Sequence, residues 1–196
     1  MTEPARPWLA RDDWREGVIY WKPNRNRFAG LSLREIIATL FGGGSTTLPA
    51  FGDSTFTFGR VPFLAGGKLE GTLRVPFTVL GEDSFAMLGC FPGTRDDTHS
   101  LHWRSIHPIL PQQLRREGEM AVFDVEFNIP AGRRPTKRGI LAFTWELSVL
   151  KGFAGRRIAL FHVPVFGPEA APFVRETISA RKAKRDARKA LSVLDE

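Results

Sequence analysis

The stretch AVFDVEFNI at residues 121–129 carries an apolar side chain at every odd position. Between them lie Asp124, Glu126 and Asn128, which are polar. Successive side chains of a β-strand point to opposite faces, so this pattern predicts a strand with one face on a core and the other in water.

Six further segments read as strands because their residues are continuously apolar or alternate in the same way. They span residues 18–21, 54–60, 69–79, 84–91, 141–149 and 159–165. In 69–79 the apolar positions predicted to face the core run from Leu69 to Phe77. The segment 84–91 differs because it is apolar at nearly every position.

Short segments rich in turn residues separate these strands, at 80–83, 92–97, 130–135 and 151–155. No helix long enough for a parallel crossover lies between them, so the strands are predicted to pair antiparallel. The chain has 16 Phe and 5 Trp, which one open sheet would leave largely in water. Two packed sheets would bury them, and the predicted fold is therefore a mostly β, antiparallel β-sandwich.

Two segments have helical rather than strand periodicity. Residues 31–41 combine helical spacing with a Ser32 cap, Glu35 three residues later and a glycine stop, which predicts a short N-terminal helix. This helix is too short and too charged to span a bilayer. The second segment runs from after Pro172 to the terminus and is predicted to be an amphipathic helix. The predicted organisation is an N-terminal segment (1–50), a β-sandwich (51–167) and a basic helical tail (168–196).

The net charge of +7 lies mainly in the tail, because residues 175–189 contain seven basic residues and only two acidic ones, Glu176 and Asp186. The cations predicted to bind a partner are Arg181, Lys182, Lys184, Arg185, Arg188 and Lys189. Clustered cations beside an apolar stripe suit an acidic protein groove, an anionic membrane surface or nucleic-acid phosphates. Nucleic acid ranks last, because no aromatic side chain follows Phe173. The alternative is a merely solvated face.

Residues that could carry chemistry are few. His99, His102 and His107 fall in a segment predicted to be a loop, but four zinc ligands are not at hand. Cys90 lies in an apolar strand and is predicted to be a buried structural thiol. GlyGlyLys at 66–68 lacks the context of a phosphate loop and reads as a turn. We therefore predict no metal, no cofactor and no catalytic residue.

Three close carboxylate pairs have simple structural explanations. Asp12 and Asp13 are typical of the start of a helix or turn. Asp96 and Asp97 are typical of a turn, and Asp124 and Glu126 lie on the solvent-facing side of a predicted strand. A hydrolase or transferase would instead require a pocket that joins His99, His102 or His162 to a carboxylate.

Eight short motifs resemble, in the same order, the signature of an uncharacterised family of bacterial inner-membrane proteins. They are PWLARDDWREG (7–17), GDSTF (52–56), PFLAGGKLEGTL (62–73), LGCF (88–91), LHW (101–103), FNIP (127–130), FTWEL (143–147) and FHVPVF (161–166). In that family a TrpLeu/AspTrp element precedes two membrane helices and an arrestin-like or immunoglobulin-like β-domain. The resemblance implies such a domain here and carries no catalytic residue.

The chain departs from that family between Tyr20 and Phe51, where the two membrane helices are missing. GlyGlyGlySer at 42–45 resembles an engineered linker, which would mean that a membrane hairpin was removed, but a natural soluble relative explains the same residues. The single cysteine and the lack of an apolar leader predict a cytoplasmic protein, at the inner face of the membrane if anchored.

Three functions follow from these observations. The first is a non-enzymatic binding or scaffolding domain that contacts a protein partner through the β-sandwich. The second is a membrane-surface or nucleic-acid adaptor that acts through the basic tail. The third is a hydrolase with a His/Asp site.

Overall fold

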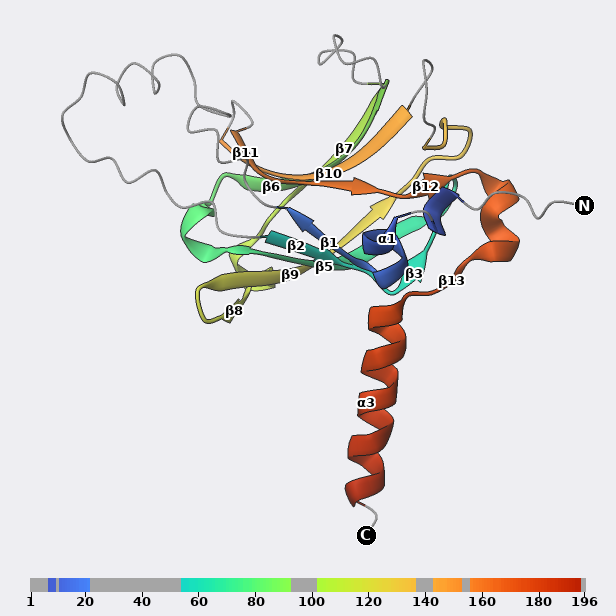
Figure 1. Cartoon of the computed structure of the whole chain (residues 1–196). Helices are drawn as coiled ribbons and strands as arrows, with labels where there is room; N and C mark the ends of the chain where they lie inside the picture. Colours follow the sequence, from blue (N-terminus) through green and yellow to red (C-terminus); the bar gives the residue numbers. More distant parts are fainter. Residues whose placement is uncertain are drawn as a thin grey trace, which may run out of the picture.

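The computed structural model describes residues 7–9, 11–21, 54–92, 102–136, 143–152 and 156–194. Two antiparallel sheets pack face to face, and a helix projects from one end of the pair (Figure 1). The predicted fold class, a mostly β antiparallel sandwich with a C-terminal helix, is confirmed, and the short N-terminal helix that the structure shows is α1 (Asp12–Glu16).

The first sheet, called the β5 sheet, has the strand order β1-β2-β5-β9-β8. Its strands are β1 (Val18–Trp21), β2 (Ser54–Thr57), β5 (Lys68–Pro76), β8 (Arg115–Glu117) and β9 (Met120–Asn128). The alternating stretch at 121–129 lies in β9, which pairs along its whole length with β5, from Lys68↔Asn128 to Pro76↔Met120. That strand is confirmed.

The second sheet, called the β6 sheet, has the order β11-β10-β6-β7. Its strands are β6 (Ser84–Pro92), β7 (Trp103–Pro108), β10 (Phe143–Lys151) and β11 (Arg156–Val163). All its pairs are antiparallel, as predicted. A short 3-10 turn, η3 (Pro111–Gln113), leads from β7 back to the β5 sheet.

The core lies between the sheets and is built from the inward positions of both. Its largest fully buried side chains are Trp145, Phe56, Phe58, Phe127, Phe161, Leu69, Leu73, Leu88, Ile129, Leu147, Ile158 and Val61. Gly71 belongs to the same face of β5, and its missing side chain makes room for the Phe56 ring, which a Cβ there would approach to 2.5 Å. Cys90 is fully buried in this core, as predicted.

Three details of the strand predictions are wrong. Phe77 was expected to face the core, but β5 ends at Pro76 and the 3-10 turn η2 (Phe77–Val79) leaves Phe77 38% exposed beneath Arg116. The strand expected over 54–60 breaks after Thr57, and a separate β3 (Arg60–Val61) follows. His107 was expected in a loop but lies in β7, an edge strand whose sequence does not alternate in polarity.

The described N-terminal residues, 7–9 and 11–21, pack onto the sandwich. The 3-10 turn η1 (Pro7–Leu9) and the helix α1 (Asp12–Glu16) bury Trp8 and Trp14, both in contact with the Phe166 ring. Phe166 belongs to β12 (Val165–Phe166), which pairs with β4 (Phe63–Leu64) in the one parallel ladder of the described strands. The helix predicted over 31–41 lies outside the described residues.

The C-terminal helix α3 (Ile178–Leu194) begins later than predicted. The chain after Gly167 first forms the 3-10 segment η4 (Pro168–Phe173) and then β13 (Arg175–Glu176), which pairs with β3. From there α3 extends away from the sandwich on the side of the β5 sheet (Figure 1). Among the described helices, none is long and apolar enough to cross a membrane.

Candidate functional site

The outer face of the β5 sheet is the polar, hydrated surface expected of an antiparallel sandwich. Lys68 pairs with Glu126 on the neighbouring strand, and Asp124 accepts hydrogen bonds from the Thr72 hydroxyl at 2.7 Å and from Arg115 at 3.0 Å. These two donors hold the pKa of Asp124 below its ordinary value, Arg115 more strongly than Thr72. This face satisfies its own polar groups.

The outer face of the β6 sheet has the opposite character. Its side chains point away from the core, yet several of them are large and apolar, and every strand contributes at least one. Phe91 is one of these and lies further along β6. The five that lie in two adjacent rows, called here the outer apolar face, are Phe85, Met87, Ile106, Leu150 and Leu160. None belongs to the core cluster: Ile106 is 43% exposed and Phe85, Met87 and Leu160 are partly exposed, whereas Leu150 is only 7% exposed. Partly exposed apolar side chains grouped on one sheet face are typical of an interaction site.

The pairing register places these residues in neighbouring rows across the sheet. One row runs Ile106, Met87, Ser148 and Leu160 from β7 to β11. The adjacent row runs Pro108, Phe85, Leu150 and Arg157. Side chains in such rows lie close enough to touch, so the five apolar residues form one continuous surface.

Two small residues leave the middle of this surface without large side chains. Ser148 is fully buried between Met87 and Leu160, and its hydroxyl has no hydrogen-bond partner among the described residues. Gly89 occupies the middle of the next row. A partner that approaches this face would therefore meet a shallow apolar floor, not a ridge.

The rim of the outer apolar face carries charge. Arg104 and Arg157 are exposed at its β7 and β11 edges, and neither forms an ion pair with a described residue. His162 and Glu146 face each other across β11 and β10, with Nδ1 and Oε1 3.7 Å apart. Partial burial lowers the pKa of His162, although Glu146 opposes this shift, so the imidazole is neutral at pH 7. The rim is thus net positive.

The histidines and carboxylates are not assembled into a catalytic site within the described residues. His102 stacks edge-on against Phe143, and His107 lies flat against Phe127 at 4.4 Å. His99 lies outside the described part of the chain. The pocket along β3 to β5 and the pocket over β5 and β9 include no histidine. No group of three metal-binding side chains occurs among the described residues.

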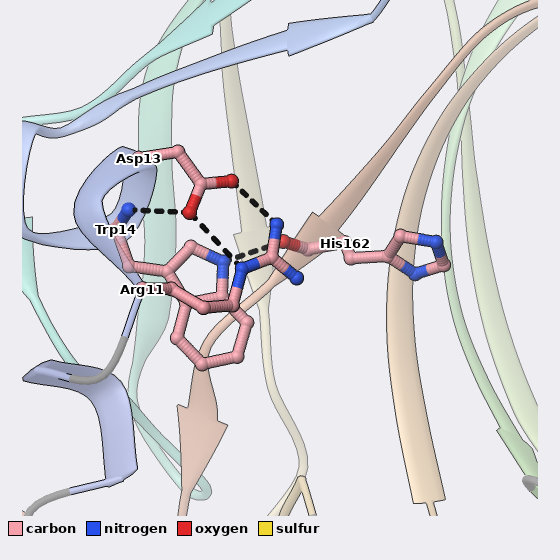
Figure 2. Close-up of polar contacts among 4 residues, drawn as sticks. All are labelled: Arg11, Asp13, Trp14 and His162. Carbon is pink, nitrogen blue, oxygen red and sulfur yellow. Dashed lines mark hydrogen bonds and ion pairs between the residues drawn. The ribbon is translucent and has the colours of Figure 1, made fainter.

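The most connected polar cluster has a structural role. Asp13 lies in the first turn of α1, where it accepts a hydrogen bond from the Trp14 N–H at 3.0 Å and pairs with Arg11 (Figure 2). The Trp14 indole then donates its Nε1–H to the His162 carbonyl at 2.9 Å, while the His162 ring points away from the cluster (Figure 2). This cluster fastens α1 to β11, in keeping with the predicted helix-start role of Asp12 and Asp13.

Cys90 is also unsuited to nucleophilic chemistry. Its side chain is fully buried, and this burial raises the pKa of the thiol to about 11 although Arg133 pulls in the opposite direction. A thiol with such a pKa is protonated at neutral pH and unreactive.

The predicted basic cations all lie on α3, beyond the body of the sandwich. Arg181, Lys182, Lys184 and Arg185 are exposed, and Lys184 reaches back to Glu176 at 3.4 Å. Arg188 and Lys189 lie further along the helix, with side chains outside the described part. The helix thus holds these six residues together and separates them from the outer apolar face, which is on the other sheet.

Sequence reasoning missed the outer apolar face, although one signal for it was present. A strand that is apolar at nearly every position is typical of burial on both sides, and residues 84–91 have this pattern. The corresponding residues on β7, β10 and β11 could be placed on the same face only once the register was known.

Comparison with known protein families found no matching family model, and comparison with well-characterised proteins found no similar sequence. The resemblance to the bacterial inner-membrane family stays a prediction.

Proposed function

We propose that this chain is a non-enzymatic binding or scaffolding domain that holds a protein partner on the outer apolar face. The observation that supports this function is the contrast between the two sheets. The β5 sheet pairs its outward polar groups with one another, whereas the β6 sheet turns Phe85, Met87 and Ile106 outward. A hydrated sheet face would carry polar residues at these positions.

The charge of the rim indicates which class of protein partner would bind this face. Arg104 and Arg157 flank the apolar floor as exposed cations without described ion-pair partners. The complementary partner is therefore a protein segment with a flat apolar face and acidic residues at its edges. An arrestin-like or immunoglobulin-like domain that binds proteins through its sheets is in keeping with this proposal, and a cytoplasmic location beside a membrane would suit it.

The experiment is site-specific photocrosslinking in the native host. A photoreactive phenylalanine replaces Ile106 in one version and Asp124, on the outer face of the β5 sheet, in the matched control. The proposal predicts one discrete protein adduct from position 106 and none of the same mass from position 124. It also predicts that Met87→Glu removes the adduct while circular dichroism stays unchanged.

Other outcomes would contradict the proposal. An adduct with a second copy of this chain would make the face a self-association surface. A crosslink within the chain itself, with no partner captured, would mean that another segment of the same chain covers the face. Equal adducts from positions 106 and 124 would show that the outer apolar face has no special role.

The second candidate is an adaptor that acts through the basic cations of α3. It is favoured by the exposure of Arg181, Lys182 and Arg185 on a helix that leaves the sandwich. Neutral substitutions at these three positions, with the outer apolar face left intact, would distinguish the two candidates.

A further inference from the structure

The two sheets differ in how their edges are covered. The β5 sheet has short edges, because β1 has four residues and β8 has three. In the β6 sheet, the edge strand β11 contacts β1, and its His162 carbonyl accepts the hydrogen bond from the Trp14 indole. The other edge strand, β7, has six residues, and β6 is the one described strand that pairs with it. Among the described strands, β7 is therefore the longest edge whose backbone meets no hydrogen bond from a described segment other than β6.

The pairing of β7 with β6 determines which of its backbone groups are unpaired. The Ile109 N–H donates to the Ser84 carbonyl at 3.0 Å, which makes these two residues a hydrogen-bonded pair. Such pairs alternate with non-hydrogen-bonded pairs along an antiparallel ladder, so the odd-numbered residues of β7 bond to β6. The N–H and C=O groups of Arg104 and Ile106 therefore point to the open edge. Pro108, which has no N–H, follows in the same series and removes no bond to β6.

An unpaired edge of this kind is a template for another extended chain. Arg104 and Ile106 each offer one donor and one acceptor, so a segment that lies beside β7 can form about four backbone hydrogen bonds with them. Antiparallel addition would continue the arrangement of the β6 sheet, in which every described pair is antiparallel. Neither a membrane surface nor a nucleic acid carries the alternating amide and carbonyl groups that such an edge requires.

The side chains of β7 specify what the added segment would carry. Ile106 lies on the outer apolar face, and Arg104 lies two residues earlier on the same side of the sheet, exposed and without an ion pair to a described residue. Residues that face each other in an antiparallel pair have their side chains on one side of the sheet. An apolar side chain opposite Ile106 would thus extend the outer apolar face, and a carboxylate opposite Arg104 would lie beside its guanidinium.

We propose that β7 is a strand-addition site for an extended segment of a protein partner, in which an apolar residue opposite Ile106 is followed, after one intervening residue, by an acidic residue opposite Arg104. The proposal rests on the proposed function, because it describes how the partner of the outer apolar face would reach the edge of the sheet. A second copy of the chain is a poorer match, since Trp103–Pro108 contains no acidic residue to pair with Arg104.

The first test follows amide hydrogen exchange of the full chain by NMR, without and with a short peptide centred on Val-Thr-Glu. In the free chain the Arg104 and Ile106 amides should exchange about tenfold faster than the Ser105 amide, which is bonded to β6. Saturating peptide should slow the exchange of these two amides about tenfold and leave that of Ser105 unchanged.

The second test measures the affinity of the same peptide, labelled with a fluorophore, after single changes. Methylation of the Glu backbone nitrogen, which would face β7, should weaken binding about tenfold. Methylation of the Thr nitrogen, which would face away, is the matched control and should stay within about twofold. Arg104→Gln should weaken binding about threefold, and Arg157→Gln, which removes an exposed cation at the opposite edge of the sheet, should leave it unchanged.

Several results would overturn strand addition. Slow exchange of Arg104 and Ile106 in the free chain would mean that another segment of the chain already covers the edge, and slowing that rises with the concentration of the chain alone would assign the edge to a second copy. Equal weakening by the two methyl groups, or no slowing at millimolar peptide, would also reject it. Peptide binding that shifts the resonances of Met87 and Leu160 without slowing these amides would reject strand addition and leave the proposed function standing. Slowing without such shifts would support strand addition and speak against the outer apolar face.

Discussion

Replacing Thr177 by alanine removes the hydroxyl that connects α3 to the sandwich. The hydroxyl satisfies two backbone groups at once, the Ala180 N–H at the start of the helix and the buried Phe58 carbonyl. No other described residue hydrogen-bonds to that carbonyl. The variant therefore loses a helix cap and leaves a buried acceptor unpaired.

The size of the effect can be added up from these parts. Loss of the cap costs about 1 kcal/mol. The unpaired carbonyl costs about 1 kcal/mol more. The buried methyl group contributes about another 0.8 kcal/mol. The free energy of unfolding of Thr177→Ala should thus fall by about 3 kcal/mol, and that of Thr177→Ser, which loses only the methyl group, by about 1 kcal/mol.

The assay is thermal and urea unfolding followed by circular dichroism, with Thr177→Ser as the matched control. For a chain of this size the melting temperature should drop by about 8 °C in Thr177→Ala and by about 3 °C in Thr177→Ser. The alanine variant should also lose helical signal below its melting temperature, because the first turn of α3 frays. Equal stability of the two variants would refute the reasoning, since the hydroxyl would then contribute nothing.

Three further outcomes are expected. Gly71→Ala should lower the free energy of unfolding by about 3 kcal/mol, because the added Cβ would lie 2.5 Å from the Phe56 ring. The control Gly59→Ala, whose Cβ would have its nearest contact at 3.9 Å, should match the wild type in urea unfolding. Cys90 should resist alkylation by iodoacetamide until the chain unfolds, because its thiol is buried and its folded pKa is about 11. Since the ordinary pKa of 9.0 is lower, the unfolded chain loses the thiol proton first, and the free energy of unfolding should fall as pH rises from 9.0 to about 11. The variant Cys90→Ala should lack this fall. His162 has a folded pKa below 6.5, so the unfolded chain binds the imidazole proton more readily than the folded chain. The free energy of unfolding should therefore fall as pH drops below 6.5. The same dependence of the free energy of unfolding on pH in His162→Gln would contradict this prediction.

The strands that alternate in polarity could be predicted from the sequence because burial on one face leaves a period of two. This held for β9 and for most of β5, but not at Phe77, where the chain turns after Pro76 and the periodicity no longer reports burial. The edge strand β7 was missed, because none of its residues is fully buried and its sequence does not alternate in polarity. Edge position is a tertiary property that the local sequence does not record.

The candidate surfaces depend still more on long-range structure. The basic cations of α3 were visible as a charge cluster, but the anchoring of the helix needs Thr177, Phe58 and Gly17, which are distant in sequence. The outer apolar face likewise needs the register of four strands. In both cases the sequence shows the residue types, but only the folded structure shows that these residues lie close together.

The most direct test of the proposed function is the heat-capacity change when the partner crosslinked at Ile106 binds the purified chain. If the partner covers the outer apolar face, calorimetry should give a clearly negative heat-capacity change and an affinity that falls only modestly with salt, because only the rim charges are screened. A heat-capacity change near zero together with a steep decline of affinity with salt would contradict the account, because binding would then rest on the cations and not on the apolar face.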